Sequence, residues 1–274
     1  MSNKLIIIIV LTLFLVSTVT AQDHGNRLNV DGDDFGEIEK INFYTKRVPV
    51  NLVGTEERFI TYEIVSKGKS EYSVSDFFSI SKKYNLLSFT EKGAGVEGVS
   101  LKITMPNNLV LEFNNETAPL SLAHLKVDYL KIKSEAGILR LVNIGGDAVD
   151  ISCTACELNM ESTEATISSV NKYGHTHIDV EALKLFNNLE HPIIASTDTG
   201  DITLKLPKDI TTTIKTRAKR IQVDDVFSPE LNEEGKYTYV RILGDKDYGN
   251  NKTQPTRNMV ILSSNQGEIH ILKR

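Results

Sequence analysis

The chain contains no tryptophan, only two cysteines and a single long apolar run. Aromatic faces are the usual stacking platform for sugars, so the absence of tryptophan weakens a carbohydrate-binding interpretation, which nine tyrosines keep open. No second motif of paired cysteines exists to complete a zinc site. Beyond the first apolar run, no stretch approaches the roughly 20 apolar residues of a membrane-spanning helix, which predicts a soluble mature chain.

The single apolar run lies at the N-terminus. Lys4 precedes apolar residues from Leu5 to Val16, and small residues then lead to Ala21. This pattern predicts a signal peptide over residues 1–21 and an exported protein, which is periplasmic, on the cell surface or secreted. A membrane anchor is the alternative, but the run is short for one.

The remainder is predicted to form a polar N-terminal arm over residues 22–44 and one domain over 45–274. Within the arm, Asp31-Gly32-Asp33-Asp34 offers oxygen ligands for calcium but lacks the rest of an EF-hand loop. The whole chain has 31 basic and 36 acidic residues, a formal net charge of −5. This acidic balance argues against nucleic acid and anionic lipid as partners.

Alternating apolar residues dominate the rest of the chain, as in Val99, Leu101, Ile103 and Met105. Such alternation, broken by Gly, Asn-Asn or Pro, is typical of half-buried strands, and only residues 179–189 suggest a helical turn. Strand-like segments recur at 138, 158 and 178, in steps of 20, and a second series at 149, 167 and 185, in steps of 18. The repeat predicts an all-β protein, a right-handed parallel β-helix or closely related β-solenoid.

A longer repeat carries a family resemblance. Residues 101–113 and 202–214 share an alternating strand, a proline, two polar residues and a second strand, with Pro106 and Pro207 as the prolines. The unit from Gly200 to Thr216 resembles the strand–Pro–strand unit of the putative adhesin family of bacterial strand-repeat proteins, an exported domain of unknown function.

Two further segments are similar to the same family: the closing segment 260–272, with its Gly-x-Ile-x-Ile strand, and the early segment 48–54. The resemblance therefore covers residues 45–274. It implies a β-helix-like exported protein and offers no catalytic residues. Residues 225–258 depart from the pattern, because they are long and polar where short turns are expected, and the register of the last strands stays open there.

Cys153-Thr-Ala-Cys156 is the sharpest local motif. In a cytosolic α/β protein it would suggest a redox dithiol or half a zinc site. Here it lies between strand-like segments, and parity places both cysteines on the inward side with Ile151 and Leu158. In an oxidising compartment a disulfide is the simplest expectation, with two buried thiols, or redox or metal chemistry, as alternatives.

His175, His177 and Asp179 are the metal-site candidates. Because Ile178 and Val180 should point inward, these three side chains should share the outward face of one strand, where two imidazoles and a carboxylate can bind a divalent ion. An outward face is also where any solvated polar residue belongs.

A basic stripe of Lys215, Arg217 and Lys219 is interpreted as a solvated edge that blocks edge-to-edge pairing. No Gly-x-Ser-x-Gly elbow or phosphate loop occurs, and no cofactor is implied.

Two functions follow. The first is a non-enzymatic cell-envelope protein, an adhesin or scaffold that binds an envelope or extracellular polysaccharide or protein. The alternative is a polysaccharide-cleaving β-helix enzyme, which needs charged residues clustered across several coils. Lys and Asp are spread evenly here instead of aligning at the 18 to 20 step, and this favours the first.

Overall fold

The computed structural model describes residues 26–29, 38–67, 72–93, 97–181, 192–208, 210–227, 229–242 and 259–274. The elements, in chain order, are β1 (Asn26–Asn29), β2 (Lys40–Thr45), β3 (Val50–Thr55), β4 (Phe59–Ser66), α1 (Val74–Phe77), β5 (Phe78–Lys83), β6 (Leu86–Glu91), β7 (Val99–Pro106), β8 (Leu109–Asn115), β9 (Leu120–Tyr173), β10 (Thr176–Val180), β11 (Ile193–Thr199), β12 (Ile202–Leu206), β13 (Thr212–Arg217), β14 (Arg220–Val223), a 3-10 helix (Asp225–Phe227), β15 (Glu230–Glu234), β16 (Tyr237–Ile242), β17 (Met259–Ser264) and β18 (Glu268–Lys273). The predicted signal peptide and the Asp31–Asp34 segment lie outside the described residues.

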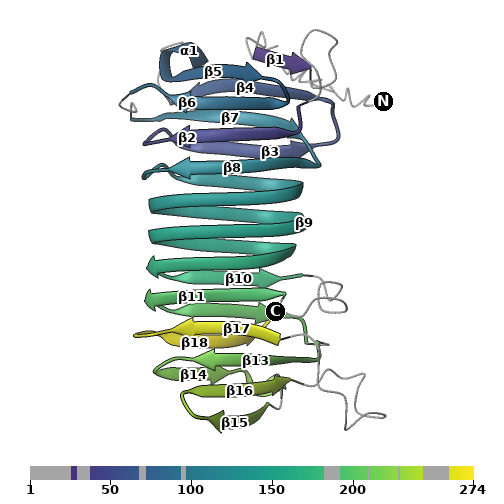
Figure 1. The fold of residues 1–274 in the computed structure, drawn as a ribbon, viewed down its shortest axis with the longest axis vertical. Coiled ribbons are helices and arrows are strands. Elements are labelled where there is room, and N and C mark those ends of the chain that lie inside the picture. The colour runs from purple at the N-terminus through teal and green to yellow at the C-terminus, as the bar shows by residue number, and fades with distance from the viewer. Residues whose placement is uncertain are drawn as a thin grey trace, which may run out of the picture.

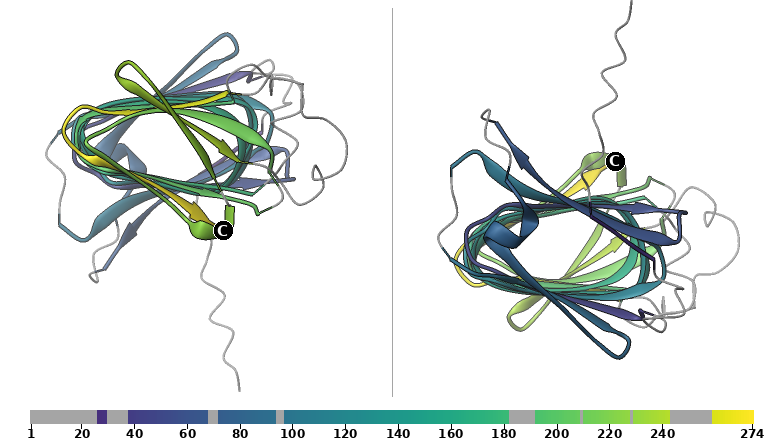
Figure 2. Two further views of the ribbon diagram at one scale, coloured as in Figure 1. Left: turned by 90° about the horizontal axis from the view of Figure 1, so that it is seen from below. Right: turned by 90° about the horizontal axis from the view of Figure 1, so that it is seen from above.

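The strands stack along one long axis, and β9 alone winds through several successive coils, a coil being one winding of the chain (Figure 1). Viewed along that axis, the coils superimpose as a flattened tube with strands on two opposite sides (Figure 2). Each coil pairs in parallel with the next, as β10 does with β9 and β12. The β-solenoid prediction is confirmed.

Inward side chains form columns that run along the solenoid. Met160, Ile178, Leu204 and Ile271 occupy matching positions in neighbouring strands, and all are fully buried. Nearer the N-terminus, the Phe43 ring stacks on Phe89 at 5.2 Å and on Phe113 at 4.4 Å between ring centroids. The inward apolar side chains of a single coil would be exposed to water on both sides of the coil. Stacking against the neighbouring coils buries them.

The repeat differs from the predicted one in detail. Ile178 pairs with Met160 and Thr176 with Leu158, which is a step of 18, whereas the sequence pattern predicts that 178 aligns with 158. Ile138, the first member of that series, is 50% exposed. Ile167 pairs with Ile193, and the predicted partner at 185 lies outside the described residues. The coils vary in length because their corners differ, so a fixed step cannot hold.

Both end segments of the domain are inserted between coils that lie apart in sequence. The β2–β3 segment lies between β6–β7 on one side and β8 and β9 on the other. At the other end, β17–β18 lies between β11–β12 and β13–β14. Contacts between residues far apart in sequence therefore hold both ends of the solenoid.

Antiparallel strands cover parts of the two outermost coils. β4 pairs with β7 and β5 with β6 at one end, while β16 pairs with β13, and β15 with β16, at the other. This covers edges that would otherwise be templates for aggregation. The predicted arm boundary at residue 45 is wrong, because Phe43 of β2 is fully buried and the domain begins before it.

Candidate functional site

One corner of the solenoid carries a column of buried polar side chains. Parallel registers align Thr45 with Asn115, Asn115 with Ser134, and Asn171 with Thr197 and then Ser264. Asn115 accepts a hydrogen bond from Thr45 Oγ1 at 2.8 Å and donates one to Ser134 Oγ at 2.8 Å. These bonds satisfy polar groups that would be costly to bury alone.

Small residues follow this column three positions later in the chain. Gly174, Gly200 and Gly267 stack so closely that a Cβ on each would come within 2.2 Å of a backbone oxygen in the neighbouring coil. Gly174 and Gly200 also adopt positive φ values of 143° and 135°, a region that favours glycine. In these three coils the corner therefore combines an inward polar residue with a glycine three positions later.

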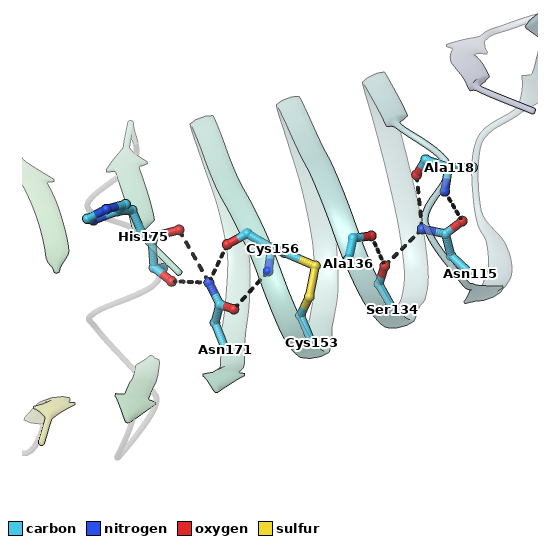
Figure 3. The surroundings of a disulfide bond; sticks show 9 residues. Asn115, Ala118, Ser134, Ala136, Cys153, Cys156, Asn171 and His175 are labelled. Atoms are coloured by element: carbon cyan, nitrogen blue, oxygen red, sulfur yellow. Dashed lines mark hydrogen bonds between the residues drawn. A yellow bond between two sulfur atoms is a disulfide. The ribbon is translucent and has the colours of Figure 1, made fainter. Parts of the chain in front are cut away.

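The disulfide occupies this column between Ser134 and Asn171 (Figure 3). Cys153 and Cys156 are bonded with a Cα–Cα distance of 5.9 Å, and both are buried. Asn171 of the next coil already donates to Cys156 O at 2.8 Å and accepts from Cys156 N at 3.3 Å. Both backbone groups of Cys156 are therefore bonded, and the disulfide fills the corner without needing a hydrogen-bond partner.

The three predicted metal ligands lie on the same outward face, but they do not form a metal-binding cluster. Ile178 and Val180 point inward, and His175, His177 and Asp179 point outward, as expected.

Each of the three metal-site candidates has its own surroundings. His175 Nδ1 accepts a hydrogen bond from Asp201 N at 3.3 Å, and Asp179 lies 2.8 Å from Arg274 Nε. Burial and the nearby Lys205 lower the pKa of His177. Among the described residues, no three His, Cys, Asp or Glu side chains lie close enough to hold a metal ion.

The outward side of the C-terminal strands is the broadest candidate surface. Registers place five outward residues in one line across five strands: Ser168, Ile194, Ile261, Lys215 and Tyr239. Neighbouring strands lie about 4.8 Å apart, so this line is about 19 Å long. We call the surface formed by Ile194, Lys215, Arg217, Tyr237, Tyr239 and Ile261 the C-terminal face.

Lys215 lies at the centre of this face. Its Nζ atom is 4.2 Å from the Tyr237 ring centroid and 5.9 Å from that of Tyr239, while Lys236 Nζ is 5.5 Å from Tyr237. Ammonium groups over aromatic rings gain from the ring quadrupole. The face thus combines positive charge, aromatic rings and aliphatic side chains on a chain whose formal net charge is −5.

The edge interpretation of the basic stripe is wrong. Lys215 and Arg217 lie on β13, which has β17 on one side and β16 on the other, so β13 is not an edge strand. Lys219 follows β13 and donates its backbone N–H to Gly267 O. Sequence reasoning identified the basic residues but missed Tyr237 and Tyr239, because the β15–β16 hairpin lies inside the polar segment 225–258. The alternation of Tyr237, Tyr239 and Arg241 was the available signal.

None of the described helices is long and apolar enough to cross a membrane.

No curated protein sequence matches the chain. Solved structures that resemble it include a putative cell adhesion protein from Clostridium sporogenes, at 14% identity over 91% of this chain and 100% of that one, with a TM-score of 0.34. A putative adhesin from Bacteroides fragilis is 12% identical over 90% of this chain and 95% of that one, with a TM-score of 0.39.

A family match completes the comparison. The family described as Toastrack DUF4097, a domain of unknown function, matches residues 98–271. These residues run from the start of β7 to the last strand, β18. Because the match covers more than half of the 274 residues, the chain belongs to the Toastrack DUF4097 family.

Proposed function

We propose that this protein is an exported, non-enzymatic adhesin-type protein whose C-terminal face binds an acidic extracellular or envelope polysaccharide. The observation that carries the proposal is the position of Lys215, which lies over two tyrosine rings and in line with Ile261 and Ile194.

The chemistry of the face suits a polymer of sugar acids. Tyr237 and Tyr239 offer apolar ring surface with a polar hydroxyl, which suits the mixed character of a sugar ring. Lys215 and Arg217 supply positive charge for carboxylates or sulfates, and a guanidinium can bind such a group through two parallel hydrogen bonds. A neutral polymer would use the rings only.

The geometry suits an extended ligand. The line of outward residues crosses five neighbouring strands over about 19 Å. Weak contacts repeated along such a surface add through effective concentration, so a long chain can bind firmly where a single sugar unit does not.

The test is retention on immobilised acidic and neutral polysaccharides, with release of new reducing or unsaturated ends followed in parallel. We expect retention on acidic polymers, and this retention should weaken as the salt concentration rises. The reason is that the Debye length shortens from about 10 Å at 0.1 M to about 3 Å at 1 M ionic strength. Tyr239→Ala and Lys215→Met should each reduce retention several-fold.

Tyr84→Ala provides a matched control. Tyr84 is 83% exposed, and Lys83 Nζ lies 5.9 Å from its ring centroid, the same distance as between Lys215 and Tyr239. It lies in the turn between β5 and β6, outside the C-terminal face. Equal losses for Tyr84→Ala and Tyr239→Ala would overturn the proposal. Polymer cleavage abolished by one Asp, Lys or His substitution would move the protein to the enzyme class.

A further inference from the structure

A pocket of about 330 Å³ lies at a corner built by the end of β3, the β7–β8 turn and the first coils of β9. This volume is at the lower end of the range for small-molecule sites, about 300–1,000 Å³. None of its residues belongs to the C-terminal face.

Three successive coils of β9 place Lys126, Gly145 and Glu164 along this pocket at a repeat of 19 residues. Glu56 enters from β3, since Val53 pairs with Ala123 and Gly54 packs on the backbone of His124. The pocket is therefore a hollow over Gly145 that has a carboxylate on the Glu56 side and another on the Glu164 side.

The backbone at position 145 does not require glycine. A Cβ there would meet only Lys126 Cγ, at an ordinary contact distance of 3.7 Å, and Gly145 does not have a positive φ. Gly54 contrasts with it, because a Cβ at Gly54 would come within 2.2 Å of His124 O. The fold demands glycine at 54 but not at 145, so a role other than folding can account for the open space.

Polar groups around the hollow are held in place by one another. Asn107 accepts a hydrogen bond from Lys126 N at 2.9 Å and donates one to Glu56 Oε1 at 3.2 Å. The Asn143 amide lies 3.0 Å from His124 Nδ1. When that amide donates, the imidazole carries its proton on Nε2 and presents a donor. The pocket thus offers oriented acceptors and donors before any ligand binds.

The charges of the side chains that line the pocket indicate which class of ligand fits it. Glu56 and Glu164 are acidic and Lys126 is basic, so these three side chains carry a formal charge of −1. Carboxylates and amides suit hydroxyl groups, and the excess negative charge suits one ammonium group. A bare divalent cation fits less well, because no three His, Cys, Asp or Glu side chains of the described residues lie close enough to hold one.

We propose that this pocket binds a single amino-sugar unit, a hydroxylated ring with a protonated amine. The carboxylates of Glu56 and Glu164 accept from the amine and hydroxyls, and the His124 imidazole donates to a ring oxygen. The site is independent of the C-terminal face, so either can fail alone.

Saturation-transfer NMR on the folded protein tests this with glucosamine, glucose and N-acetylglucosamine. We expect glucosamine to bind at least tenfold more tightly than the other two. Gly145→Ile should abolish binding by filling the hollow, and its circular-dichroism spectrum checks that it folds. Gly145→Ala, whose Cβ has room, should fold with an unchanged melting temperature and weaken binding less. Glu164→Gln should weaken glucosamine binding several-fold.

Two controls complete the experiment. Glu161→Gln removes a nearby carboxylate that pairs with Arg140 outside the pocket and should leave binding unchanged. Tyr239→Ala on the C-terminal face should also have no effect. Equal binding of glucose and glucosamine, competition by calcium, or the absence of glucosamine binding would each overturn the proposal.

Discussion

Replacing Cys153 and Cys156 by alanine should cost about 2 kcal/mol of unfolding free energy. The disulfide closes a loop of only four residues, 153–156, for which the loop-entropy relation gives about 2 kcal/mol at 25 °C. For a domain of this size, that corresponds to a fall in Tm of roughly 4–8 °C. Urea unfolding followed by circular dichroism measures the difference, and intact mass with and without reduction checks that the parent is bridged.

The corner column makes a sharper prediction about asparagine at position 153. Asn115 and Asn171 hold matching corners, so a sequence repeat alone would favour Cys153→Asn with Cys156→Ala. Asn171, however, already bonds to both backbone groups of residue 156, so the new amide would compete with Asn171 for them and be buried with part of its hydrogen-bonding capacity unmet. We expect this variant to be about 1–3 kcal/mol less stable than the double-alanine variant. Equal or greater stability would refute the claim that Asn171 saturates this corner.

Three further predictions test the core, the topology and one titration. Ile178→Ala should lower the unfolding free energy by about 2–5 kcal/mol, because it opens a cavity between Met160 and Leu204. The outward His177→Ala should lower it by under about 1 kcal/mol. Similar losses for both variants in urea unfolding would refute the assignment of Ile178 as inward and His177 as outward. Ending the chain at residue 258 removes the inserted β17–β18, so β11–β14 should lose hydrogen-exchange protection while most of β9 keeps it; normal protection of β13 would contradict this topology. The hydrogen bond from Tyr129 to Asp150 raises the phenol pKa to about 12, and burial also raises the pKa of Tyr62. In a titration at 295 nm, Tyr129→Phe should therefore remove the component that ionises near pH 12 and leave that of Tyr62, and in the parent the stability should fall as pH rises from 10 to 12.

Strand alternation made much of the fold predictable. Val99, Leu101, Ile103 and Met105 alternate because one side of each strand faces a shared core, and all four are buried in the structure. Pro106 was expected between two alternating strands, and β7 ends there. The inward parity of Cys153 and Cys156 was likewise readable from their neighbours, and it placed them where a disulfide forms.

The insertion of the end segments was not predictable from local pattern. Nothing in Ile41 or Phe43 indicates that β2 lies between β6 and β8, because parallel pairing between distant strands leaves no local mark. The same holds for β17, whose neighbours β11 and β13 are both earlier in the chain. The C-terminal face depends on this insertion, since Ile261 lies between Ile194 and Lys215.

The corner column, by contrast, had a signal in the sequence. Asn115, Ser134, Cys153 and Asn171 recur at steps of 19, 19 and 18. A polar residue at an inward position is costly unless it is bonded, so its recurrence at the coil length marks a hydrogen-bonded corner. The more numerous apolar residues also fit a step of 20, which is wrong for residues 158 and 178.

Hydroxyl-radical footprinting with a bound acidic polysaccharide tests whether the C-terminal face is the binding surface. Tyrosine side chains react readily when exposed, so burial under a ligand is seen as lost oxidation in mass spectrometry. We expect the bound polymer to protect Tyr237, Tyr239 and Ile194 from oxidation. Oxidation of Tyr84 should be unchanged, and the polymer should not be shortened. Protection elsewhere with an unchanged C-terminal face, or cleavage of the polymer, would contradict the proposal.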